Sequence, residues 1–238
     1  MKATEAALLV FLKKSDQFVI PIYQRTYSWG ERECRQLWND IVFAGKRQES
    51  GAHFVGSIVY IQDGIYQAST ITPILVIDGQ QRLTTVMLLL EALARYLEQH
   101  ESLDVISPED IRGDFLLNER KKGNDRFKLL LTQSDRETLC ALVTQKDLPR
   151  EPSIRMMANF QLFTDWISSM GSDLASLWRG LSRLILVDVS LDRDHDNPQL
   201  IFESMNSTGK ELSQADLIRN FVLMGLEPAL QTQLYGAS

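Results

Sequence analysis

The stretch VIDGQQRLTT, residues 76–85, separates a short apolar run from a long amphipathic segment. Residues 74–77 are apolar and too few for a helix, so they predict a strand. Between residues 83 and 97, apolar side chains recur every three or four positions, which predicts a helix. Gly79 lies in the connection, and the segment therefore predicts a strand–turn–helix unit.

The remaining segments predict both helices and further strands. We expect helices over residues 3–14, 32–43 and 198–205, and mostly helical structure from Ser107, a typical N-cap before Pro108, to about residue 180. Short apolar or β-branched runs predict strands at residues 18–20, 57–61, 128–131 and 184–189. The sequence predicts an α+β fold, with one domain over residues 1–238 and a helical insertion around residues 101–182.

Composition argues against a membrane or secreted protein. No apolar run approaches the ~20 residues that cross a bilayer, and residues 1–14 mix acidic and basic side chains, unlike a signal peptide. Cys34 and Cys140 have no CxxC or Cys/His spacing, which predicts ordinary reduced thiols and no structural zinc. We expect a soluble, cytoplasmic protein.

The formal net charge of −6 predicts that any contact with nucleic acid is local. The densest basic stretch is RKKGNDRFK, residues 120–128, with five basic side chains and one acidic side chain. Two explanations of this stretch stay open: a solvated loop, and an edge of the protein that tracks the phosphates of a nucleic-acid backbone.

The turn before the predicted central helix has the features of a phosphate site. The first backbone N–H groups of a helix have no partners within it, and they favour an anion there. Arg82 adds a planar cation suited to phosphate oxygens, and Thr84 and Thr85 add hydroxyl groups. The alternative is plain structural capping, because a strand, a glycine and a polar helix start are common.

A second candidate is the loop IPIYQRTYSW, residues 20–29, which we expect to be exposed at the surface. Tyr23, Gln24, Arg25 and Tyr27 combine flat faces for a base with groups that can grip a phosphate. Aromatic residues in loops also act as lids over a core, and this alternative stays open.

A third candidate is FESMNSTGKELSQADLIRN, residues 202–220. Its turn and the capped helix after it supply further groups for binding a nucleotide: Asn206, Gly209, Lys210, Arg219 and Asn220. A helix–turn–helix corner explains the same pattern.

These three stretches, together with HFVGSIV at residues 53–59, resemble in this order the N-terminal domain of GmrSD-type restriction enzymes, which are type IV and modification-dependent. The family belongs to the ParB/sulfiredoxin-like superfamily. The resemblance spans most of the chain, and it implies a ParB/sulfiredoxin-like small mixed sheet with a largely helical middle and C-terminal region.

The resemblance also implies a nucleotide-hydrolysing domain that governs cleavage of modified DNA in phage defence. Some family members sense phosphorothioate-modified DNA, and others act on glucosylated or methylated cytosine. The family's signature for nucleoside triphosphate hydrolysis falls on five consecutive residues here: Asp78, Gly79, Gln80, Gln81 and Arg82. Its Y-Q-R loop falls on Tyr23, Gln24 and Arg25, and its N-x-x-G turn on Asn206 and Gly209.

Relatives usually carry or recruit an HNH-type nuclease with a histidine-rich metal site. His53, His100 and His195 are widely separated here, so we expect no nuclease centre in this chain. We expect the chain to be the N-terminal part of a longer protein, with the nuclease domain fused or acting in trans.

The leading hypothesis is an NTPase that uses Mg²⁺. Arg82 would stabilise charge on the phosphoryl group, Asp78 would hold the metal or orient water, and Gln80 or Gln81 would position the attacking water. The alternatives are a nucleotide- or DNA-binding switch without hydrolysis and a structural scaffold. The sequence does not select a nucleotide, a DNA modification or an oligomeric state.

Overall fold

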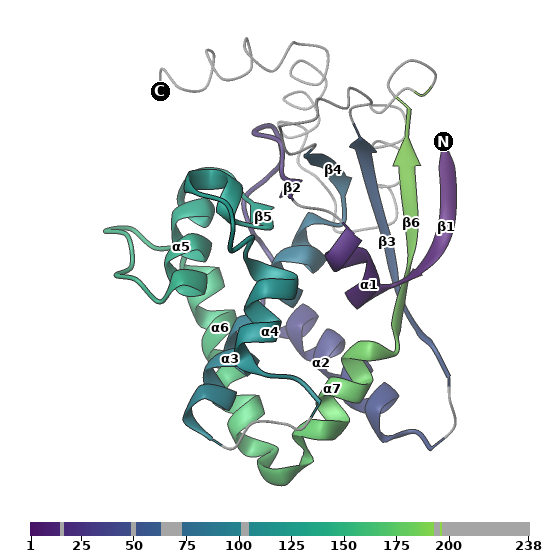
Figure 1. Cartoon of the computed structure of the whole chain (residues 1–238), viewed down its shortest axis with the longest axis vertical. Coiled ribbons are helices and arrows are strands. Elements are labelled where there is room, and N and C mark those ends of the chain that lie inside the picture. Colours follow the sequence, from purple (N-terminus) through teal and green to yellow (C-terminus); the bar gives the residue numbers. More distant parts are fainter. Residues whose placement is uncertain (15–16, 49–50, 63–72, 101–104, 193–195, 197–238) are drawn as a thin grey trace.

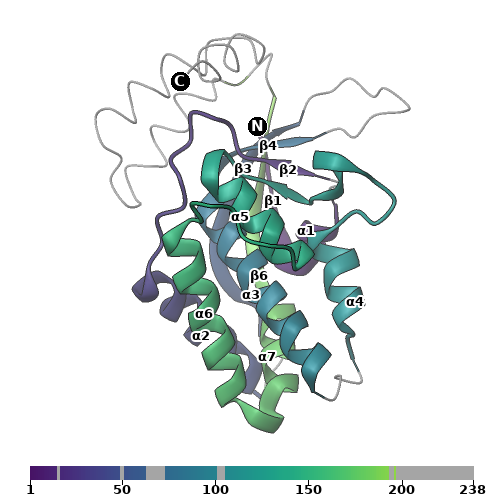
Figure 2. The same cartoon turned by 90° about the vertical axis from the view of Figure 1, so that its left-hand side faces the viewer.

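The structure, a computed structural model, describes residues 1–14, 17–48, 51–62, 73–100, 105–192 and 196. In this part of the chain a six-stranded mixed sheet lies beside a group of helices, as Figures 1 and 2 show from two sides. This architecture confirms the predicted α+β class. The helices predicted after residue 197 lie outside the described residues.

The strand order of the sheet is β1-β6-β3-β4-β2-β5. β6 pairs parallel with β3 and antiparallel with β1, while β4 pairs antiparallel with β3 and parallel with β2. The strands are β1 (Lys2–Ala7), β2 (Phe18–Val19), β3 (His53–Gln62), β4 (Ile74–Asp78), β5 (Leu129–Leu130) and β6 (Leu184–Leu191). The strands predicted at residues 18–20, 57–61, 74–77, 128–131 and 184–189 are thereby confirmed.

The helical elements of the described residues include seven α-helices. They are α1 (Leu8–Lys14), α2 (Glu31–Lys46), α3 (Gln80–Gln99), α4 (Pro108–Ile111), α5 (Gln133–Thr144), α6 (Ile154–Ser169) and α7 (Leu174–Ser182), with the short turns η1 (Arg112–Leu116), η2 (Gly123–Arg126) and η3 (Gly171–Asp173). Ser107 caps α4 in a box with Asp110, as its place before Pro108 predicted.

The prediction of one helix over residues 3–14 is wrong in its first half. Residues Lys2–Ala7 form β1, and the helix begins only at Leu8. Alanine, lysine and glutamate favour a helix locally, but β1 pairs along its whole length with β6, from Lys2 opposite Ser190 to Ala7 opposite Ile185. Pairing with a distant strand therefore overrides local propensity.

The core forms around α3, which is buried along nearly its entire length. Its leucines pack with side chains of the sheet, such as Phe18 and Tyr60, and of α6, such as Phe163. Because α3 starts directly after β4, this packing fixes the position of the turn at Gly79. No helix in the described part of the chain is long and apolar enough to cross a membrane.

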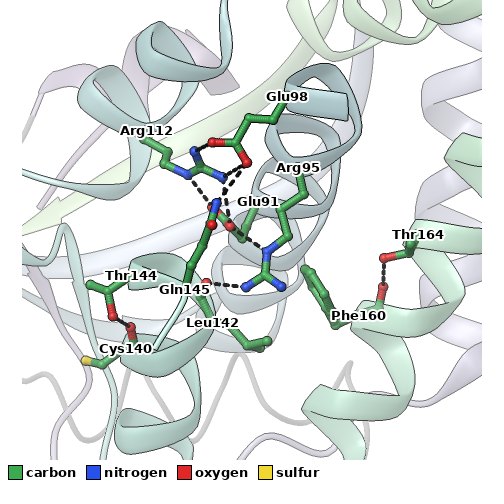
Figure 3. Close-up of polar contacts among 10 residues, drawn as sticks. All are labelled: Glu91, Arg95, Glu98, Arg112, Cys140, Leu142, Thr144, Gln145, Phe160 and Thr164. Carbon is green, nitrogen blue, oxygen red and sulfur yellow. Dashed lines mark hydrogen bonds and ion pairs between the residues drawn. The ribbon is translucent and has the colours of Figure 1, made fainter. Parts of the chain in front are cut away.

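An ionic network around the buried Glu91 fastens α3 to η1 and α5 (Figure 3). The Glu91 carboxylate is fully buried and accepts hydrogen bonds from Arg95 Nε at 2.9 Å and from Arg112 Nε at 3.0 Å. Arg112 also pairs with Glu98, to which Gln145 Nε2 at the end of α5 donates at 2.8 Å. Burial raises the pKa of Glu91, and the two arginines oppose that shift. The network joins α3, η1 and α5.

Candidate functional site

The candidate site begins at the turn between β4 and α3. Gly79 is the N-cap of α3 and has φ 96°, in the left-handed region that favours glycine. A Cβ at this position would lie 3.0 Å from Ile58 Cγ1 and 3.1 Å from the Ser57 carbonyl oxygen, so the turn presses closely on β3. No side chain caps the first turn of α3, and no acidic residue lies in it. This end of the helix suits an anion.

The Arg82 side chain crosses from α3 to a bulge in β3. Its Nη1 donates to the Ser57 carbonyl oxygen at 2.8 Å. The pairing of β3 with β6 shifts register between Phe54 and Ser57, and Gly56 in this bulge has φ +103°. A Cβ on Gly56 would lie 2.5 Å from Arg82 Nη2, so the glycine makes room for the guanidinium group.

The Arg82 guanidinium group has unused hydrogen-bonding capacity. Among the described residues, its one hydrogen-bond acceptor is the Ser57 carbonyl oxygen, although a guanidinium group carries five N–H donors. Burial lowers the pKa of Arg82, and the Asp78 carboxylate opposes that shift. A partly buried cation with free donors can accept an anionic ligand.

Asp78 at the end of β4 is the carboxyl group of this site. Burial raises its pKa, and three features oppose the shift: the N–H of Gly79 and the charges of Arg82 and Arg25. Among the described residues, neither arginine forms a close ion pair with Asp78. The structure thus brings Arg25, from the second candidate stretch, close to Asp78, Gly79 and Arg82 of the first.

The predicted glutamine residues are engaged inside the protein. Gln80 Nε2 donates to Gln24 Oε1 at 2.9 Å, and Gln24 Nε2 donates to the carbonyl oxygen of Ile77 at 2.7 Å. Both glutamines are buried. This chain of amides ties the loop of residues 20–29 to both the strand and the helix of the turn.

Gln81 fastens the next part of the same loop. Its Oε1 accepts from Ser28 N at 2.7 Å and from Trp29 N at 3.3 Å, and its Nε2 donates to the Thr26 carbonyl oxygen at 3.3 Å. Thr84 Oγ1 donates to the Gln80 carbonyl oxygen at 2.9 Å, within α3 itself. Gln81 therefore fixes the backbone that carries Arg25.

The prediction of an exposed loop over residues 20–29 is wrong for most of its side chains. Tyr23, Gln24 and Tyr27 are buried, and Thr26 alone in this loop is exposed. The bonds from Gln80 and Gln81 draw the loop onto α3, which explains the burial. Arg25 remains partly exposed and lines a small cavity of about 10 Å³ with Gln80 and other residues of the loop and helices.

Tyr27 is the centre of a hydrogen-bonded chain that joins three parts of the fold. Thr85 Oγ1 donates to the Gln81 carbonyl oxygen at 2.8 Å, so the Tyr27 hydroxyl donates to Thr85 Oγ1 at 2.7 Å. Asn159 Nδ2 of α6 in turn donates to the Tyr27 hydroxyl at 2.9 Å. Burial strongly raises the pKa of Tyr27, which keeps this hydroxyl protonated.

Helices α5 and α6 contribute residues that were not predicted from the sequence. Asp135 Oδ2 of α5 accepts from Tyr27 N at 2.6 Å, and Asn159 Nδ2 also donates to the Trp29 carbonyl oxygen at 2.9 Å. Asn159 lies among apolar residues of a predicted helix, and a polar side chain there is the signal that could have identified it. Gly56, the residue directly before the predicted strand of residues 57–61, was the signal for the bulge.

Some of the predicted residues lie outside the described part of the chain. They are Asn206, Gly209, Lys210, Arg219 and Asn220, together with His195. His53 Nε2 lies 3.3 Å from Asp40 Oδ1, and the His100 ring stacks on Tyr96 at 3.9 Å. In the described residues, no group of three or more His, Cys, Asp or Glu side chains could hold a metal ion.

The fold and the site define an α+β domain with a partly buried arginine at the uncapped start of its central helix. Residues 8–223 match the family described as GmrSD restriction endonuclease, N-terminal domain. The match covers most of the chain, and the chain belongs to this family, which gives it a role in the restriction of modified DNA. No curated protein matches the chain.

Proposed function

We propose that the chain is a nucleotide-binding and nucleotide-hydrolysing sensor domain, which couples turnover of a nucleoside triphosphate to recognition of modified DNA. The observation that carries this proposal is the Arg82 guanidinium group, held on Ser57 across Gly56 with further donors available beside the uncapped start of α3. A helix start and an arginine fork together suit a phosphate group.

In this proposal Arg82 stabilises the negative charge of the transferring phosphoryl group. Its guanidinium group is already positioned by Ser57, so little reorganisation is needed when the charge develops. Arg25 is the second cation, because its charge also acts at Asp78 from the loop of residues 20–29. Both arginines would contact phosphate oxygens.

Asp78 is the residue that would hold a magnesium ion or orient the attacking water. It is the carboxylate whose charge acts on Arg82, and Mg²⁺ in nucleotide sites is held by one or two carboxylates together with phosphate oxygens and water. The donor set therefore fits an ion that arrives with the triphosphate. Such an ion would neutralise charge on the phosphates.

We assign Gln80, Gln81, Gln24 and Thr85 the positioning of the site instead of direct chemistry. Their side chains already bond to one another, to backbone groups or to Tyr27, with contacts of 2.7 to 3.3 Å. These contacts set the distance between Arg25 on the loop and Arg82 on the helix.

A second candidate is a ParB-like switch that binds a nucleotide or DNA without hydrolysing it. The contacts of Tyr27 favour this candidate, because they join the site to α5 and α6 and offer a route by which a ligand could shift these helices. In both candidates DNA cleavage belongs to an HNH-type nuclease domain, fused to this chain or acting in trans.

Phosphate release by the purified protein distinguishes the two candidates. The assay follows release from several nucleoside triphosphates with Mg²⁺, with and without phosphorothioate or cytosine-modified DNA. We expect turnover that modified DNA alters and that Arg82→Ala reduces at least about tenfold, because a charge-assisted contact of roughly 1.5–3 kcal/mol is lost. Arg32→Ala is the control, since that side chain is 90% exposed at the start of α2. Nucleotide binding without turnover would favour the switch.

A further inference from the structure

A cleft lies between the turn around η2 and helix α5. It has a volume of about 580 Å³. One wall is the turn around η2, and the other is formed by α5 and the segment that follows it. The lining residues are Gly123, Asn124, Arg126 and Phe127 on the first wall, and Arg136, Glu137, Cys140, Ala141, Thr144, Lys146, Asp147 and Pro149 on the second.

Three cations lie on the two walls of this cleft. Arg126, Arg136 and Lys146 are exposed, and none of them forms an ion pair with another described residue. The lining sets these three cations against two carboxylates, those of Glu137 and Asp147, whereas the chain as a whole carries a net charge of −6, so the cleft is a local departure from the protein's charge. Residues 120–122, two lysines and an arginine, extend this exposed basic surface along the chain before the turn.

The wall that carries Arg126 is held in place by buried contacts. Gln17 Nε2 donates to the carbonyl oxygens of Asn124 at 2.9 Å and of Phe127 at 3.0 Å, and Gln17 is buried. Leu117 and Phe127 also form an antiparallel bridge. The basic turn is therefore a fixed edge of the fold, which reduces the entropy that binding a ligand would cost.

α5 connects this cleft with the candidate nucleotide site. Asp135 on the helix accepts the hydrogen bond from Tyr27 N in the loop that carries Arg25, and the next residue, Arg136, lines the cleft. A ligand that displaces α5 would therefore act on that loop. The two sites are thus distinct and share one helix.

We infer that the cleft between η2 and α5 binds the phosphate backbone of duplex DNA. The inference rests on the proposed function, in which the chain senses DNA, and adds the surface that would hold it. Arginine and lysine side chains on a fixed edge bind phosphates without reading bases, and they set the position of a protein on a duplex. The exposed part of the basic stretch, residues 120–126, is then an edge that tracks phosphates, one of the two explanations that the sequence of residues 120–128 allowed, whereas Lys128 is buried.

The first test replaces the three cations together. In the full chain, Arg126→Ala, Arg136→Ala and Lys146→Ala should weaken binding of a short fluorescent DNA duplex at least about tenfold, and should reduce the slope of log affinity against log salt by about 2–3. The control is Lys2→Ala, Arg32→Ala and Lys46→Ala, which removes the same charge from exposed positions on β1 and α2. The control should bind the duplex as the unaltered protein does.

Nucleotide binding separates this inference from the proposed function. The triple cleft variant should bind a nucleoside triphosphate normally, whereas Arg82→Ala should not. If the unaltered protein does not bind a nucleoside triphosphate, the proposed function is overturned. The comparison of duplex binding between the cleft and control variants would still test the cleft. Equal loss of duplex binding in the cleft and control variants, or no duplex binding by the unaltered protein, would overturn the inference.

The cysteines offer a second measurement that needs no substitution. Cys140 lines the cleft and is partly exposed, whereas Cys34, the other cysteine of the chain, is fully buried. Burial raises the pKa of Cys140 to about 11, so its alkylation is best followed at alkaline pH. The short duplex should slow alkylation of Cys140, and a nucleoside triphosphate alone should not. Unchanged alkylation in the presence of saturating duplex would contradict the inference, and slowing by nucleotide alone would point to nucleotide as the occupant.

Discussion

Substitution of Gly56 tests the site without removing any of its charged groups. Gly56 lies in the β3 bulge at φ +103°, and a Cβ there would come within 2.5 Å of Arg82 Nη2. The guanidinium group is the end of a flexible side chain, so in Gly56→Ala it should move away while the strand stays in place. Arg82 then loses its 2.8 Å hydrogen bond to the Ser57 carbonyl oxygen.

The expected loss of stability follows from these two effects. An alanine at positive φ costs about 1–2 kcal/mol, and loss of one hydrogen bond costs about 1 kcal/mol, so Gly56→Ala should destabilise the fold by roughly 2–3 kcal/mol. Displacement of Arg82 should also lower phosphate release or triphosphate affinity at least about tenfold. The control is Gly113→Ala, where a Cβ would meet its nearest atom, Glu119 Oε1, at an ordinary 3.5 Å.

A double-mutant cycle shows whether the two residues act through each other. With Arg82→Ala present, the alanine at position 56 meets no guanidinium group, so the double variant should be more stable than the sum of the single effects by about 1 kcal/mol. Urea denaturation measures the stabilities, and phosphate release or nucleotide titration measures the site. Two results together would refute this account of Gly56 and Arg82. They are a double variant whose loss of stability equals the sum of the two single losses, and normal nucleotide turnover in Gly56→Ala.

Three further substitutions examine the other parts of the site. Arg25→Ala should leave the melting temperature nearly unchanged, since Arg25 has no hydrogen bond to another described residue, yet weaken nucleotide or modified-DNA binding; unaffected binding of both would remove the loop from the site. Tyr27→Phe removes one hydrogen bond each from the buried Thr85 and Asn159 side chains and should cost about 1–3 kcal/mol of stability as well as nucleotide affinity, whereas Tyr96→Phe, a tyrosine stacked on His100, should cost neither. Burial raises the pKa of Asp78 above its ordinary value of 3.8, so the folded state binds this proton more tightly than the unfolded state does. The resulting contribution to the free energy of unfolding is fully present below pH 3.8 and is lost as the pH rises through the raised pKa. Asp78→Asn should therefore stabilise the protein at neutral pH but not in acid, while reducing turnover; destabilisation at neutral pH in urea titrations would contradict the raised pKa.

Local sequence was sufficient for the strand–turn–helix unit and for its charged residues. Gly79 stands between a four-residue apolar run and a strongly periodic segment, so the turn, α3 and the place of Arg82 follow from adjacent residues. The cap of α4 at Ser107 is equally local. Local structures of this kind are determined by residues that are adjacent in the sequence, and contacts with distant residues do not change them.

The parts that could not be predicted depend on contacts between distant residues. Residues Lys2–Ala7 favour a helix by composition and become a strand only because β6 lies beside them. The burial of Tyr27 requires Asn159, which is separated from it by 132 positions. The bulge at Gly56 makes room for the Arg82 guanidinium group, and this contact exists only because α3 places Arg82 against β3. The spacing of residues in the sequence does not predict any of these three contacts.

A crystal structure of the chain with a non-hydrolysable nucleoside triphosphate and Mg²⁺ tests the central claim most directly. The claim is that the turn from Asp78 to Arg82 is the phosphate site. We expect the triphosphate to lie against the first turn of α3, with Arg82 bonded both to Ser57 and to phosphate oxygens, and with Arg25 on the opposite side of the phosphates. A nucleotide bound elsewhere, with Arg82 still contacting only Ser57, would contradict the claim.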